Sequence, residues 1–142
     1  MLVMERMGQH PVSVAPGDTV RTAARLLSLR NVGALPVAGP DGVVKGIVTD
    51  RDLVTRCMAA GKDPDTTPVR DVMTRGPVSI SPHDEVSRAA ALMARRQVRR
   101  LPVAEGGKLV GMLSLGDLSR ITALRMEAAR ALTEISSGVR RL

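Results

Sequence analysis

The sequence predicts a mixed α/β (α+β) fold, in which one β-α-β-β-α unit occurs twice. Three observations lead to this prediction. A shift of 66 residues aligns Pro11 with Pro77 and keeps aligning similar residues through the following segment. Each copy ends in the same motif of Gly, two aliphatic residues, Thr or Ser, two variable residues and Asp. Finally, two apolar runs in each copy flank a short turn rich in Gly, as a β-hairpin requires.

The internal repeat covers most of the chain. At the first offset, Leu35-Pro36-Val37-Ala38 coincides with Leu101-Pro102-Val103-Ala104. One deletion in the hairpin turn changes the offset to 65, which then brings Gly46 onto Gly111 and Asp52 onto Asp117. Agreement at so many spaced positions is not expected by chance, so the chain contains two copies of one structural unit.

The element order follows from periodicity and turn residues in each copy. We expect a short strand at 11–14 and a helix with Asp18 as its N-cap, ending near Asn31. Strands at 35–38 and 43–48 come next, and a second helix begins at Asp50 and stops before Gly61. The second copy repeats this order, with strands at 78–80, 101–104 and 109–114 and helices at 84–96 and from Gly116.

The predicted domain boundaries follow the repeat. Residues 1–61 form the first repeat with an N-terminal helical turn, and residues 62–67 form a polar, turn-rich linker. Residues 68–135 form the second repeat with an extended C-terminal helix, and residues 136–142 form a tail. Because three strands and two helices bury little apolar surface alone, we expect the two repeats to pack sheet against sheet as one domain.

The last helix is expected to run from Asp117 to about Ile135, longer than its counterpart in the first repeat. Apolar residues recur along one of its faces: Leu118, Ile121, Leu124, Ala128, Leu132 and Ile135. One interpretation is packing on its own module. The extra length instead favours contact with a second subunit, so we predict a homodimer.

The candidate functional residues lie where a strand gives way to a helix, at Thr49 and Ser114. A helix start has unpaired backbone N–H groups that favour anions. Asp52 and Asp117 follow three residues later, and a carboxylate can accept hydrogen bonds from ribose hydroxyls. This combination suits a nucleotide. The structural alternative is that these residues only cap helices, and their recurrence in both copies favours the functional interpretation.

The composition limits the other functions. A net charge of +7 favours anionic partners, but the basic residues are scattered, as on an ordinary solvated surface. The chain has no Phe, Tyr or Trp, so it has no aromatic platform for stacking bases of single-stranded nucleic acid. His10 and His83 are too few for a metal site, and Cys57 is a lone cysteine. Neither a signal peptide nor a membrane-spanning segment is visible, so we expect a cytoplasmic protein with no membrane partner.

The paired unit, the Gly-aliphatic-aliphatic-Thr/Ser-x-x-Asp junction and the Leu-Pro-Val strand resemble a tandem of cystathionine-β-synthase (CBS) domains, the Bateman module. The stretches AAGKDPDTTPVRDVM, TDRDLV and QVRRLPV resemble the small stand-alone CBS-pair proteins of bacteria. The resemblance implies two repeats about a pseudo-twofold axis, usually in a dimer. It also implies a non-catalytic sensor of AMP, ADP, ATP or S-adenosylmethionine, bound as a ligand and not as a cofactor.

The resemblance further implies two clefts between the repeats. In the first cleft, Thr49 would bind phosphate or ribose and Asp52 the ribose hydroxyls. The base would lie among Val78, Ile80 and Val98, with Arg99 and Arg100 near the phosphate. In the second cleft, Ser114 and Asp117 would take the polar roles, with the remaining positions filled by Val12, Val14, Val32, Gly33 and Ala34. Arg51 is a further candidate, for which a surface role is the alternative.

The two clefts are not equivalent, since Arg forms charge-assisted bonds to phosphate that Gly33 and Ala34 cannot form. We therefore predict that the Thr49 cleft binds phosphate more tightly, and the loss of both Arg contacts in the other cleft could separate the two affinities by roughly a hundredfold or more. Alternatively, Arg99 or Arg100 serves the Ser114 cleft. The sequence leaves three functions open: a regulatory ligand-binding module with an unidentified effector protein, a structural dimer or stress-response partner without a ligand, and, least favoured, a nucleic-acid binder.

Overall fold

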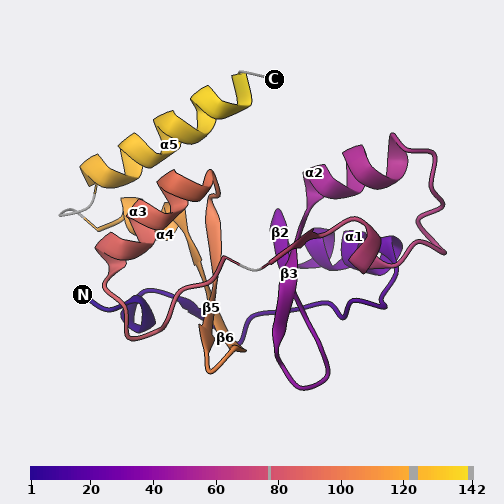
Figure 1. The fold of residues 1–142 in the computed structure, drawn as a ribbon, viewed down its shortest axis with the longest axis horizontal. Helices are drawn as coiled ribbons and strands as arrows, with labels where there is room; N and C mark the ends of the chain where they lie inside the picture. Colours follow the sequence, from indigo (N-terminus) through magenta and orange to yellow (C-terminus); the bar gives the residue numbers. More distant parts are fainter. Residues whose placement is uncertain (77, 122–124, 141–142) are drawn as a thin grey trace. The chain divides into compact units, whose positions relative to one another are not determined.

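The structure is a computed structural model that describes residues 1–76, 78–121 and 125–140, and it divides into two compact units (Figure 1). Unit 1 contains residues 1–11 together with 78–106, 110–121 and 125–140. Unit 2 contains residues 12–76 and a short piece, Gly107–Leu109. Each unit therefore combines one repeat with a segment from elsewhere in the chain.

Unit 2 is built on the first repeat. Helix α1 (Val20–Arg30) is followed by the antiparallel hairpin of β2 (Ala34–Ala38) and β3 (Val44–Thr49). A short helix α2 (Asp50–Asp52) continues as the π-helix η2 (Leu53–Met58). After the linker come the 3₁₀ helix η3 (Val69–Asp71) and the strand β4 (Thr74–Arg75). The strand order of the sheet is β2-β3-β4.

Unit 1 is built on the second repeat in the same way. It contains the 3₁₀ helix η1 (Val3–Glu5), β1 (Gly8–Gln9) and α3 (Val86–Arg96). The hairpin of β5 (Arg100–Glu105) and β6 (Lys108–Ser114) leads into α4 (Leu115–Ser119), and α5 (Arg125–Arg140) follows. The strand order is β1-β6-β5. The predicted hairpins and the α/β class are confirmed.

The third strand of each sheet comes from the segment that precedes the other repeat. Strand β1 pairs with β6, and β4 pairs with β3, both antiparallel. Backbone hydrogen bonds fix the neighbouring turns as well: the N–H of Val3 donates to the carbonyl of Asp84 at 2.9 Å, and the N–H of Val69 to that of Asp18 at 2.7 Å. The expected first strand of each repeat is reduced to a single parallel bridge, Val14 with Val37 and Ile80 with Val103.

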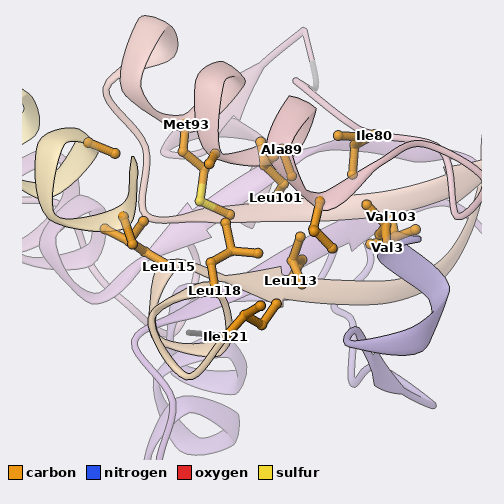
Figure 2. Close-up of a cluster of buried hydrophobic side chains, with 14 of the residues drawn as sticks. Val3, Ile80, Ala89, Met93, Leu101, Val103, Leu113, Leu115, Leu118 and Ile121 are labelled. Atoms are coloured by element: carbon orange, nitrogen blue, oxygen red, sulfur yellow. The ribbon is translucent and has the colours of Figure 1, made fainter. Parts of the chain in front are cut away.

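Each unit has its own apolar core, made from aliphatic side chains and Met, with Cys57 added in unit 2. In unit 1, Val3 of η1 joins residues of α3, β5, β6 and α4 in one cluster (Figure 2). Leu101, Leu113 and Met93 in this cluster are completely buried. In unit 2, Val69 and Val72 from the segment after the linker complete the cluster in the same manner. The borrowed segments therefore supply core residues as well as strands.

Two local predictions were wrong. The N-cap of α1 is Thr19, whose side chain accepts a hydrogen bond from the N–H of Thr22, whereas Asp18 accepts one from the N–H of Ala15 in the preceding turn. Both residue types are good caps, so neighbouring candidates compete. The last helix is also not continuous from Asp117, because α4 ends at Ser119 and α5 begins at Arg125. Leu124, expected on its apolar face, lies outside the described residues.

Helix α5 also extends further than expected, through the Ser136-Ser137-Gly138 stretch to Arg140. Serine costs only a fraction of a kcal/mol in a helix, so two serines do not stop one that is already formed. Ile135, with 5% of its surface exposed, anchors the preceding turn in the core. No helix among the described residues has the length and apolar character needed to cross a membrane.

Candidate functional site

Both strand-to-helix junctions form reciprocal capping boxes. At the first junction, Thr49 Oγ1 accepts from the N–H of Asp52 at 3.1 Å, and Asp52 Oδ2 accepts from the N–H of Thr49 at 2.9 Å. At the second, Ser114 Oγ and Asp117 Oδ2 make the same two bonds at 3.0 and 2.9 Å. The capping role of these residues is therefore confirmed for both pairs, and a ligand-binding role stays a prediction. Each capping box uses one carboxylate oxygen of its Asp and leaves the other oxygen able to accept further hydrogen bonds.

The surroundings of that second oxygen differ between the two junctions. Asp52 Oδ1 lies 3.7 Å from Nε of Arg56, one turn further along the helix. The residue that corresponds to Arg56 in the second repeat is Ile121, which is buried. Within the described part of the chain, Asp117 has no ion-pair partner. The half-buried Asp117 carboxylate is therefore better placed to accept hydrogen bonds from a ligand than Asp52 is.

Each junction is tied to the start of a strand in its own unit. The N–H of Leu115 donates to the carbonyl of Arg99 at 2.8 Å, and the N–H of Asp50 donates to that of Gly33 at 3.0 Å. These equivalent bonds hold Arg99 and Arg100 beside the Ser114 junction. They hold Gly33 and Ala34 beside the Thr49 junction. The junction of unit 1 therefore has two arginines beside it, whereas the junction of unit 2 has two uncharged residues at the same positions.

A pocket of about 500 Å³ lies at the Ser114 junction. Its polar lining includes Arg99, Arg100 and Ser114. Neither arginine forms an ion pair with any described residue, so neither guanidinium group is committed to an acidic partner there. Its volume is in the range of pockets that hold small-molecule ligands. The rest of the lining consists of Leu115, Gly116, Ser119, Ala128, Ala129 and Leu132.

The other predicted residues divide between the units. In unit 1, Ile80 is buried in the core, and Val78 and Val98 pack against it half-buried. In unit 2, Val14 and Ala34 are buried, Val12 and Gly33 are half-buried, and Val32 is 41% exposed. Arg51 is exposed. The predicted assembly of these residues into two clefts, each drawn from both repeats, stays a prediction.

The pocket residues of α4 and α5 were missed from the sequence. Gly116 and Ser119 lie within or just after the junction motif, so their position beside Ser114 could have been inferred. Ala128 and Leu132 belong to the apolar stripe of the last helix, for which the sequence favours contact with a second subunit over packing on its own module. The break between α4 and α5 allows α5 to pack beside the pocket of its own unit.

The described residues contain no group of three or more His, Cys, Asp or Glu side chains arranged to hold a metal ion. Cys57 is buried, and its thiol lies 3.5 Å from the carbonyl of Lys62. The clearest features of the site are therefore two arginines, a hydroxyl and a neighbouring carboxylate.

The pattern of the CBS domain matches this sequence twice, at residues 3–59 and 69–123. The chain therefore belongs to the CBS domain family, as a tandem pair, and the resemblance seen in the sequence is confirmed. It is 42% identical over 134 residues to the CBS domain-containing protein YhcV of Bacillus subtilis, covering 94% of each chain. It is 32% identical over 107 residues to Hypoxic response protein 1 of Mycobacterium tuberculosis, covering 75% of each.

Solved structures of CBS proteins share the fold. The protein TA0289 from Thermoplasma acidophilum matches with a TM-score of 0.84 and 26% identity, over 94% of this chain and 75% of that one. Hypoxic Response Protein I, solved with two coordinated zinc ions, matches with a TM-score of 0.80 and 29% identity, over 85% and 98%. The CBS pair of MJ0100, in complex with 5′-methylthioadenosine and S-adenosyl-L-methionine, has a TM-score of 0.78 and 23% identity, over 88% and 98%.

Proposed function

We propose that this protein is a non-catalytic regulatory module that binds an adenosine-containing nucleotide in the unit 1 pocket. The observation that carries the proposal is that Arg99 and Arg100, both without an acidic partner among the described residues, line one pocket with Ser114. Asp117 is hydrogen-bonded to Ser114 and has a second carboxylate oxygen available. Cationic, hydroxyl and carboxylate groups together match the phosphate and ribose of a nucleotide.

The charge of the pocket favours one kind of adenosine ligand. Two guanidinium groups attract phosphate, whereas they repel the positive sulfonium group of S-adenosylmethionine. We therefore expect AMP, ADP or ATP to bind more tightly than S-adenosylmethionine. We replace the prediction that the Thr49 cleft binds phosphate more tightly with the alternative in which the arginines serve the Ser114 site, because the bond from the N–H of Leu115 to the carbonyl of Arg99 holds them beside it. The Ser114 site should then bind nucleotide more tightly than the Thr49 site.

The shared fold supports the ligand class. The MJ0100 pair holds two adenosine-containing molecules, which shows that a CBS pair can accommodate such compounds. In this chain the residues that would contact them are its own Ser114, Asp117, Arg99 and Arg100. The ligand would act as a signal, and its effect would pass to a partner protein that is not yet identified.

A structural role as a homodimer is the second candidate, favoured by exposed apolar residues in unit 2. Leu29 of α1 is 77% exposed, and Met58 of η2 is 73% exposed. Exposed apolar side chains mark a protein interface where they form a contiguous patch. Among related structures, a CBS-CP12 protein from bloom-forming cyanobacteria, 30% identical to this chain, is hexameric. The two candidates are compatible, because a dimer can also bind nucleotide.

Isothermal titration with AMP, ADP, ATP and S-adenosylmethionine tests the ligand-binding proposal. Asp117→Asn is the informative variant, because the amide oxygen can still cap α4 while the second acceptor for ribose is lost. Asp52→Asn is the matched control in the other unit. We expect AMP binding to weaken by about tenfold or more in Asp117→Asn, equivalent to about 1.4 kcal/mol, and to change little in Asp52→Asn. Absence of binding by the wild-type protein for every ligand would overturn the proposal.

A further inference from the structure

Helix α5 lies outside the family repeat. The CBS match in the second half of the chain ends at residue 123, and α5 begins at Arg125. In the first half, the corresponding segment after η2 is a series of turns that leads into the linker. The pocket of unit 1 therefore has one wall that the repeated unit itself does not provide.

Core packing fixes the position of this wall. Ala128, Ala131 and Ile135 of α5 are at most 5% exposed and belong to the core cluster of unit 1. The same cluster contains Ala89 and Ala90 of α3, so small residues on both helices permit close approach. Figure 1 shows α5 in yellow next to α3 and α4, with which it makes its main contacts.

Three residues of α5 line the pocket: Ala128, Ala129 and Leu132. Ala129 is exposed and Leu132 is 44% exposed, so neither is needed to fill the core. The pocket is therefore cationic at the start of β5, hydroxylated at Ser114 and Ser119, and apolar along α5. Such a lining suits a ligand that has an anionic group at one part and a flat apolar group at another.

We propose that α5 is the specificity-determining wall of this pocket, with Ala129 and Leu132 as the residues that limit the size of the ligand and contact its apolar part. The proposal rests on the function proposed above and adds the element that determines which ligands fit the pocket. The small side chain of Ala129 leaves space that a larger residue would fill. Leu132 offers apolar surface that a bound ligand would cover. Ligand selection would then depend on residues outside the repeat that defines the family.

Two variants of opposite kind test this wall in the full-length protein. Ala129→Phe fills the pocket, and Leu132→Ala removes apolar contact surface. By titration calorimetry we expect AMP affinity to fall about tenfold or more in the first and about threefold to tenfold in the second. The matched control is Ala91→Phe, at an exposed position of α3 that does not line the pocket. We expect this control to bind AMP as the wild type does, and thermal unfolding by circular dichroism checks that all variants fold.

Amide hydrogen exchange gives a second measurement that does not need a substitution. Addition of AMP to the wild type should slow exchange in the turns of α5 that contain Ala129 and Leu132, relative to α1 in unit 2. Unchanged affinity in both variants, together with unchanged exchange in α5, would overturn the role of α5 while leaving nucleotide binding intact. Failure of the wild type to bind any nucleotide would overturn both proposals.

Discussion

At the residue scale, Asp117 shows how one side chain can be structural and functional together. Its Oδ2 accepts a hydrogen bond from the N–H of Ser114 at 2.9 Å and completes a capping box, which leaves the acceptor capacity of Oδ1 for other donors. Asp52 makes the same cap, but Arg56 lies near its second oxygen. The difference between the two sites therefore depends on neighbours and not on the motif itself.

The ion pair between Arg21 of α1 and Asp65 of the linker gives a pH-dependent prediction. The hydrogen bond from Arg21 holds the pKa of Asp65 below its usual value of 3.8. Because the pKa is lower in the folded state, the pair stabilises the fold above about pH 4, and this contribution is lost as the pH falls through the folded pKa. Both side chains are exposed, so the effect is small.

The measurement compares the midpoint of thermal unfolding of the wild type with that of Asp65→Asn, by far-UV circular dichroism. We expect the variant to be slightly less stable at neutral pH and equal to the wild type in acid. Asp71→Asn, an exposed Asp without an ion pair among the described residues, is the control. A destabilisation of Asp65→Asn that persists undiminished at low pH would contradict this assignment.

At the element scale, the Gly of the repeated motif is explained by the third strand of each sheet. A Cβ atom on Gly46 would lie 3.1 Å from Met73 Sδ and closer still to the carbonyl oxygen of Thr74. On Gly111 it would lie 2.9 Å from the carbonyl oxygen of Gly8. The borrowed strands β4 and β1 therefore approach so closely that no side chain fits at these positions.

We predict that Gly46→Ala lowers the free energy of unfolding by about 1–3 kcal/mol, because the backbone of β4 must move. Gly8→Ala is the matched control, since its Cβ would meet its nearest neighbour at 3.7 Å, an ordinary contact. Denaturant unfolding followed by circular dichroism measures both, as the chain has no aromatic residue for fluorescence. Equal stabilities of the two variants would show that β4 does not pack on β3 as described.

The hairpins, α1 and α3 and the two junctions could be predicted from the sequence because each has a strong local signal. The turn residues between β2 and β3 and the hydroxyl-to-Asp spacing at Thr49 and Ser114 are examples. The third strands could not be predicted, because β1 and β4 are two residues long, exposed and without alternation. Their pairing depends on contacts distant in sequence. The break after Ser119 was missed because the apolar period continues across it.

At the scale of the whole molecule, each unit is completed by chain from outside its own repeat. Val3 of the N-terminal segment lies in the core of unit 1, and Val69 and Val72 lie in the core of unit 2. Neither repeat alone contains a complete sheet. The arginine pair and α5 are found only in unit 1, so a duplicated fold carries two chemically different junctions. The predicted homodimer stays a prediction, because α5, which suggested it, packs on its own unit.

The central claim is that Arg99 and Arg100 bind the phosphate of a nucleotide beside Ser114, and the most direct test compares AMP with adenosine. Calorimetric affinities would be measured for the wild type and for a variant carrying both Arg99→Ala and Arg100→Ala. We predict that the wild type prefers AMP to adenosine by tenfold or more, and that this preference disappears in the variant while adenosine affinity is little changed. An AMP preference that survives the loss of both arginines would contradict the account.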